Sequence, residues 1–181
     1  MIAQIEGPDT ETGYKVWKLD PLTLVVLSKD EAQQVTYVEY RLKTGWGIGM
    51  DTLTTNPFSV DGIRFGDSER MVQALENPDA YASDGSVITG YRCDNRTFAG
   101  RAAALHFVFE NEGVVRFAYT GNGGAEDFAP FLSEISAQYG APYVGEDLIA
   151  LWEIEDGVIC ALSTSGEGTC VEFFQSQGGG Q

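Results

Sequence analysis

The chain has 181 residues, of which 43% are hydrophobic and 21% are charged, and its formal net charge is −16. A chain of this length and composition folds as a globular protein with its own core, and no apolar run approaches the roughly 20 residues that a membrane-spanning helix needs. Because a strongly negative surface repels nucleic acid and anionic membranes, we expect no nucleic-acid binding and no membrane insertion. The same charge either attracts a basic protein partner, which we expect, or only keeps the chain soluble.

The beginning of the chain resembles its end when residues 1–43 are laid over residues 135–176. Both segments indicate a helix end, a break at glycine and proline, and then three strands. The matching pieces are AQIEGP (3–8) with AQYGAP (137–142), Trp17 with Trp152, and VEY (38–40) with VEF (171–173). The N-terminal segment is therefore interpreted as the second half of a module whose complete form follows.

Two helices are expected between these segments. Asp67 and Ser68 suit a helix start and Pro78 suits a stop, so residues 67–77 are predicted to form a short helix. An apolar stripe with helical spacing predicts a second helix that ends at Gly140, and its members are Phe128, Phe131, Leu132, Ile135 and Tyr139. Alternating apolar residues predict strands at 85–93, 103–121, 147–155, 158–164 and 169–175, the second of these being a hairpin that turns at 111–113.

These elements predict an α+β fold with antiparallel sheets packed on two short helices. A half-module at residues 1–44, with a helix end and three strands, is expected to pack on the rest of the chain. Residues 45–60 form the connection, residues 61–175 the complete module, and residues 176–181 a disordered tail.

Part of the chain is similar to a known family. Phe65-Gly66-Asp67-Ser68 followed by Val72, Leu75 and Pro78, together with FVFENEGVVRF (107–117), resembles the BamE-like (SmpA/OmlA) outer-membrane lipoproteins and the β-lactamase inhibitor protein. The resemblance implies a bacterial, non-enzymatic module whose sheet or loops grip another protein.

Residues for catalysis or cofactor binding are scarce. His106 is the only histidine, and its place in a predicted strand favours a structural role over that of a catalytic base. The segment TGNGGAED (120–127) lacks the third glycine and the lysine of phosphate loops, so it is interpreted as a turn. Cys160 and Cys170 would face each other if a hairpin turned near Ser165, and they then form a disulfide or remain free thiols. We expect no catalytic residues, no cofactor and no metal.

Candidate partner-binding residues lie in three places. Trp46 stands between glycines in the connection, where a large ring suits an interface anchor as well as a cap on the core. The segment CDNRTFAG (93–100) is expected to be a loop tip, and the remaining candidates are acidic residues on strands near the C-terminus. Besides Trp46, the full set comprises Asp94, Arg96, Phe98, Glu153, Glu155 and Glu172.

The leading functional hypothesis is an inhibitor or immunity-type protein that neutralises a basic toxin, nuclease or other enzyme through a sheet and loop surface. The alternative is a scaffold or assembly module of the bacterial envelope, and a third reading is an enzyme that uses acidic residues alone. The expected location is the cytoplasm if Met1 is the native start, and the periplasm or envelope if a signal peptide has been removed. The sequence leaves the oligomeric state open.

Overall fold

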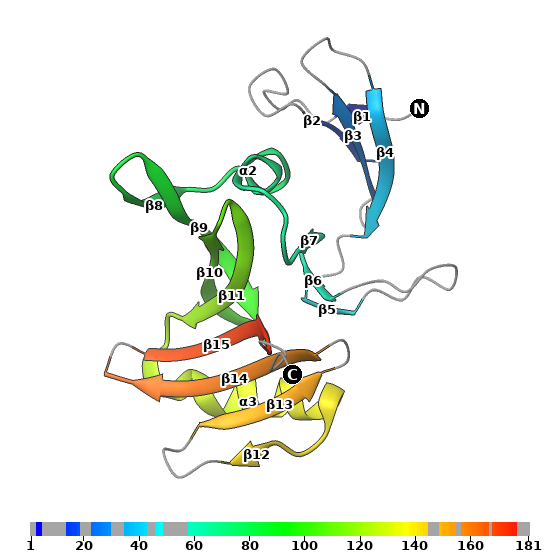
Figure 1. Ribbon diagram of the computed structural model, residues 1–181. Coiled ribbons are helices and arrows are strands. Elements are labelled where there is room, and N and C mark those ends of the chain that lie inside the picture. The colour runs from blue at the N-terminus through cyan, green and yellow to red at the C-terminus, as the bar shows by residue number, and fades with distance from the viewer. Residues whose placement is uncertain are drawn as a thin grey trace, which may run out of the picture. The chain divides into compact units, whose positions relative to one another are not determined.

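The fold is given by a computed structural model, which describes residues 3–4, 14–18, 23–29, 35–42, 46–48, 58–144, 149–154, 157–166 and 168–176. Before residue 58 the description covers the backbone and the side chain of Arg41. The predicted α+β class with antiparallel sheets and two helices is confirmed (Figure 1). Contacts divide the chain into two compact units, Met1–Asn77 and Pro78–Gln181. The module boundaries near residues 44 and 60 remain a prediction.

Unit 1 contains a four-stranded antiparallel sheet in which neighbours in sequence are neighbours in space. Its order is β1-β2-β3-β4, and a second sheet has the order β5-β6-β7. The strands are β1 (Ala3–Gln4), β2 (Tyr14–Lys18), β3 (Thr23–Lys29), β4 (Val35–Leu42), β5 (Trp46–Ile48), β6 (Phe58–Val60) and β7 (Ile63–Arg64).

The predicted first helix is α2 (Glu69–Glu76). The hydroxyl of Ser68 accepts a hydrogen bond from the Met71 N–H and so caps the free donors at the helix start. Asn77 ends the helix in the left-handed conformation, with φ of 47°. Met71, Val72 and Glu76 are buried, and Leu75 is half-buried.

Asp67, the residue before the cap, has a different role from the one expected. Its carboxylate accepts hydrogen bonds from Arg41 of β4, with a distance of 3.0 Å to Nη2, and from the Arg64 N–H at 2.8 Å. The Arg41 guanidinium also donates to the carbonyl oxygen of Gly62 at 2.9 Å. Arg41 is only 3% exposed. Its ion pair with Asp67 connects the end of β4 to the turn before α2.

Unit 2 is built on an eight-stranded antiparallel sheet in the order β12-β13-β14-β15-β11-β10-β9-β8. The strands are β8 (Ala80–Asp84), β9 (Val87–Phe98), β10 (Arg101–Glu110), β11 (Gly113–Gly121), β12 (Tyr143–Val144), β13 (Ala150–Ile154), β14 (Val158–Ser165) and β15 (Gly168–Gln175). The predicted hairpin turn is present, and Asn111 and Glu112 both adopt positive φ there. A bulge beside Val108 pairs Phe109 with Val114, whereas the alternation predicted Val115.

Helix α3 (Phe128–Tyr139) covers one face of this sheet, and the short helix η1 (Gly124–Asp127) leads into it. Figure 1 shows α3 behind β13 and β14. Phe131 and Ile135 are fully buried, and the Phe131 ring meets the Phe98 ring with centroids 4.8 Å apart. The Trp152 indole N–H donates to the Gly140 carbonyl at 2.9 Å, which ties the end of α3 to β13.

The two segments with similar sequences form strands that pair in the same order and register. The strands β1 to β4 and β12 to β15 follow the same order, and in each set the tryptophan pairs with the residue eight positions later. The equivalent cross-strand rows are Trp17–Val25–Tyr40 in unit 1 and Trp152–Cys160–Phe173 in unit 2. The second row is buried, which explains why it combines two large aromatic rings with a small apolar cysteine.

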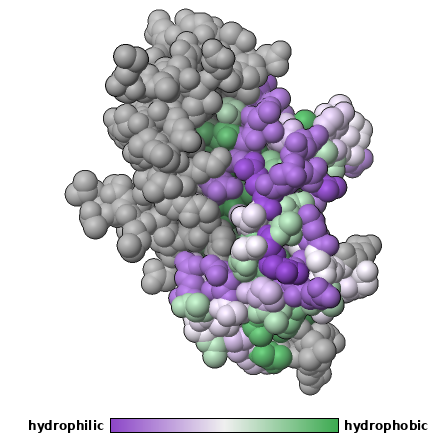
Figure 2. Space-filling view, turned by 180° about the vertical axis from the view of Figure 1, so that it is seen from behind, coloured by the Kyte–Doolittle hydropathy of each residue, from purple (hydrophilic) through white to green (hydrophobic). Residues whose placement is uncertain are grey.

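No helix within the described parts of the chain has the length and apolar character to span a membrane. The coloured surface in Figure 2 is mostly hydrophilic, with hydrophobic residues scattered among it in small patches. This pattern is ordinary for a globular protein.

Candidate functional site

The face of the eight-stranded sheet opposite α3 is the candidate site, and we call it the outer face. Side chains alternate between the two faces of a strand, so the cross-strand pairs identify its members. One row crosses all eight strands, and it consists of Ala80, Arg92, His106, Ala118, Glu172, Ala161, Leu151 and Tyr143. The next row consists of Ala82, Gly90, Val108, Arg116, Phe174, Ile159 and Glu153.

The outer face keeps large apolar groups partly in contact with water. Five apolar residues on four of its strands are half-buried, whereas the corresponding residues of the α3 side are fully buried. They are Val108, Leu151, Ile159, Ala161 and Phe174. A surface that combines half-exposed apolar groups with a few charges is typical of protein interfaces.

Two ion pairs lie on or beside the outer face, and the Arg116–Glu172 pair stands between Val108 and the other four apolar residues. Arg116 of β11 donates to Glu172 of β15 at 2.9 Å, and Arg92 donates to Asp94 at 2.8 Å within β9. Both arginine side chains are about half exposed, so water weakens the attraction in each pair. The pairs make the outer face less negative than the net charge of the chain suggests.

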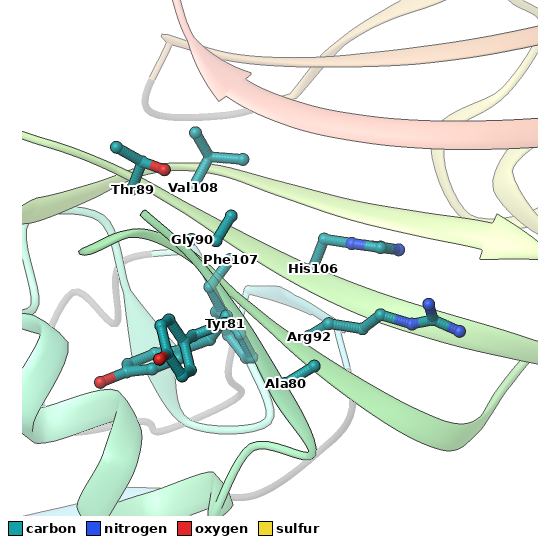
Figure 3. A pocket seen from close by; sticks show the side chains of 10 residues that line it. Ala80, Tyr81, Thr89, Gly90, Arg92, His106, Phe107 and Val108 are labelled. Atoms are coloured by element: carbon teal, nitrogen blue, oxygen red, sulfur yellow. The ribbon is translucent and has the colours of Figure 1, made fainter. Parts of the chain in front are cut away.

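A pocket of about 370 Å³ lies beside these residues, over β8, β9 and β10. Figure 3 shows the His106 and Arg92 side chains pointing the same way from neighbouring strands. Burial and the positive charge of Arg92 lower the pKa of His106, while Asp94 acts weakly in the other direction. The imidazole is therefore neutral at pH 7 and can both donate and accept a hydrogen bond.

Three of the predicted site residues lie on or beside the outer face. Glu153 is exposed, Glu172 is half-buried, and Asp94 is joined to the outer face by its bond to Arg92. Strand alternation was the signal that placed Glu153 and Glu172 there. The half-buried apolar residues of the outer face were not predicted, although the same alternation contained them.

The prediction of a loop at residues 93–100 is wrong. These residues belong mostly to β9, which continues to Phe98 before the turn at Ala99 and Gly100. A bulge at Asp94 and Asn95 shifts the alternation by one residue, because Arg96 pairs with Ala103 but Cys93 pairs with Leu105. Phe98 consequently points into the core, where it is 1% exposed, and Arg96 is half-buried on the same side. Phe98 is therefore not a surface anchor.

The other predicted residues are only partly covered by the structure. Trp46 begins β5, but its side chain lies outside the described residues. Glu155 and most of the predicted tail also lie outside them.

The cysteines are free thiols, and a disulfide between Cys160 and Cys170 does not form. The hairpin turns between Ser165 and Gly168, so Cys170 pairs with Ser163. Cys160 lies three residues from Ser163 and thus points to the opposite face of the sheet. Over the described residues, no group of three histidine, cysteine or acidic side chains is arranged to hold a metal ion.

Comparison with known proteins adds no identification. No protein-family model, no curated protein and no solved structure matches this chain.

Proposed function

We propose that this chain is a non-enzymatic binding protein that holds a basic protein partner through the outer face of its sheet. The observation that carries the proposal is the set of half-buried apolar residues on that face, with the Arg116–Glu172 ion pair among them. Burying such residues against a partner removes apolar area from water, which is the main favourable term in association. The paired charges add specificity at small energetic cost.

The charge distribution supports a basic partner. From Phe117 to Gln181 the sequence contains ten carboxylates and no lysine or arginine. This part of the chain includes β12 to β15, which carry four of the five half-buried apolar residues of the outer face. A negative field around the docking face accelerates encounter with a positively charged protein and weakens as salt increases.

The proposal predicts a mode of binding that can be measured with purified proteins. A panel of basic nucleases and toxins, with acidic proteins of similar size beside them, would be tested for binding to the full chain at low and high salt. We expect one or more basic proteins to bind, with an affinity that falls as salt is raised. Binding that ignores salt, or binding of acidic proteins alone, would contradict the proposal.

Two variants distinguish the effect of the outer face on binding from the effect of overall charge. Ile159→Lys places a charge at the half-buried centre of the outer face, and Ala137→Lys adds the same charge at an exposed position of α3. We expect Ile159→Lys to weaken binding by about tenfold or more, as the loss of a central interface residue does, and Ala137→Lys to change it little. Equal effects of the two variants would show that the outer face is not the contact surface.

A further inference from the structure

We propose that the free edge of β8 is where the partner inserts an extended basic segment, which pairs with β8 as an added strand and places an aromatic side chain in the pocket over Ala80 and Ala82. This inference rests on the proposed function, because it names the part of the basic partner that the sheet would recognise. The outer face would supply the broad contact, and the β8 edge would supply main-chain hydrogen bonds.

Among the strands that the structure describes, β8 stands at one end of the sheet, with β9 as its neighbour on one side and no strand on the other. All five of its residues are exposed, and Tyr81 is 69% exposed. In an antiparallel pair, alternate residues direct their N–H and C=O groups away from the partner strand. The open side of β8 therefore offers main-chain donors and acceptors to another strand, which is the basis of recognition by strand addition.

The charges along this edge favour a basic occupant. Exposed carboxylates stand just before the strand and at its last position, as Asp79 and Asp84. Asp79 accepts a hydrogen bond from the Asp94 N–H of β9 at 2.7 Å, so its carboxylate lies on the β9 side of the strand start, and Asp84 is the carboxylate nearer the open edge. No basic residue occurs from Asp79 to Asp84, so an added strand with lysine or arginine near its ends would find a carboxylate at each end.

The pocket lies directly beside the edge. Its lining has small residues on β8 and β9, namely Ala80, Ala82 and Gly90, and larger groups on β10 that include His106 and Val108. Gly90 cannot carry a side chain without displacement, since a Cβ there would lie 2.9 Å from the Phe107 carbonyl oxygen. The hollow is thus fixed by the packing of β9 against β10.

The size and chemistry of the pocket suit an aromatic ring with a hydroxyl group. A volume of about 370 Å³ is at the low end of ligand pockets, which favours one side chain over a larger molecule. A tyrosine can place its ring against the pocket and keep its O–H at the open side, where water accepts the bond. An aromatic residue on the added strand would lie over Ala80 and Ala82 of the neighbouring strand, at the β8 side of the pocket, because side chains contact their cross-strand neighbours on a sheet face.

A second copy of this chain is a less suitable occupant. Antiparallel pairing of two β8 edges would bring Asp79 of one copy near Asp84 of the other, and each chain has a net charge of −16. Like charges placed opposite each other destabilise a strand pair. Self-association is therefore an outcome that the experiment must be able to detect.

The test uses the full chain and a short blocked peptide with a lysine at each end and a central tyrosine flanked by valines. His106 is the only histidine, so its imidazole gives one unambiguous signal in a nuclear magnetic resonance titration. We expect saturable shifts of that signal and of the amides of Ala80–Asp84. A peptide with glutamate at each end should not bind, and serine in place of the tyrosine should weaken binding by about tenfold.

Matched variants test the edge and the pocket separately. Asp84→Asn should weaken peptide binding about two- to fivefold, the effect of one exposed charge pair, whereas Glu110→Gln, an exposed carboxylate at the β10–β11 turn, should not. Ala82→Leu should weaken binding by filling the pocket. The inference would be overturned if the peptide did not bind, or if it shifted signals elsewhere on the chain. It would also be overturned if these variants did not change binding, or if the chain associated with itself through β8 as its concentration rose. If the peptide does not bind the chain but Ile159→Lys still weakens the binding of a basic protein, only the proposed β8 site is refuted. The proposed function is then still supported.

Discussion

Asp127 accepts a hydrogen bond from the Nε of Arg101 at 2.7 Å and another from the Gly123 N–H, also at 2.7 Å. The Asp127 side chain is 1% exposed, whereas that of Arg101 is 42% exposed. The carboxylate therefore depends on these two bonds, while the guanidinium can turn to water. This pair joins the start of β10 to the turn between β11 and α3.

The first prediction is that Asp127→Asn lowers the free energy of unfolding by about 1–3 kcal/mol, the usual effect of losing a hydrogen bond from a charged group to a buried acceptor. Chemical denaturation followed by fluorescence measures it. Glu126→Gln is the control, because Glu126 is adjacent and exposed. Equal stability of Asp127→Asn and the unmodified chain would show that the carboxylate contributes nothing.

The second prediction concerns the glycines around that carboxylate. A Cβ on Gly121 would lie 2.9 Å from the Asp127 Cγ, and buried Asp127 has little room to move. Gly124 has open space around a Cβ, but its φ of +66° disfavours other residues. We expect Gly121→Ala to cost about 1–3 kcal/mol of stability through crowding and Gly124→Ala about 1 kcal/mol through backbone strain. The reverse order in thermal or urea unfolding would contradict this account.

The sequence predicted the parts of the fold in which burial repeats with a regular period. The hairpin at 103–121 was predictable because Leu105, Phe107 and Phe109 alternate along one side of the strand, and Leu105 and Phe107 meet Tyr119 and Phe117 across the turn. The start of α2 was predictable because Ser68 provides a cap. In both cases the local pattern and the tertiary packing agree.

The sequence failed where one residue changes the register. The bulge at Asn95 has no signal except a residue that tolerates positive φ, here 55°, yet it turns Phe98 from the predicted surface into the core. β8 was missed because AYASD contains no apolar alternation, since all its side chains face water. The candidate site was predicted only through Asp94, Glu153 and Glu172, and its apolar part depended on knowing which face α3 covers.

The third prediction follows from the cysteine positions. Cys93 and Cys160 are fully buried, and burial raises the pKa of the Cys160 thiol. Burial and the nearby Glu172 also raise the pKa of Cys170, which is only half-buried. Thiolate is the reactive form, so Cys160 and Cys170 should react slowly, and burial shields the Cys93 thiol from the reagent. We expect iodoacetamide to label Cys170 alone in the folded chain and all three after denaturation, as peptide mass spectrometry would show. A nonreducing digest that links Cys160 to Cys170 would refute the register.

The last prediction is a dependence of stability on pH that comes from one residue. The folded chain holds the pKa of His106 below its ordinary value of 6.5, chiefly because the imidazole is half-buried and secondly because Arg92 is near. Between the folded-state pKa and 6.5, the unfolded chain binds a proton that the folded chain does not. The contribution of His106 to stability is therefore complete above pH 6.5 and is lost as pH falls through this window.

His106→Gln removes the titrating group while keeping a polar side chain at the same place on β10. We expect the unmodified chain to lose stability between about pH 7 and pH 5.5, and the variant to lose less over that interval, where most carboxylates stay ionised. Urea unfolding at several pH values measures the difference. Arg92→Gln provides a second readout, because removing the neighbouring positive charge should raise the His106 pKa toward 6.5. The pH interval over which stability is lost should then become narrower. Parallel pH curves for the unmodified chain and His106→Gln would show that the imidazole titrates alike in the folded and unfolded states.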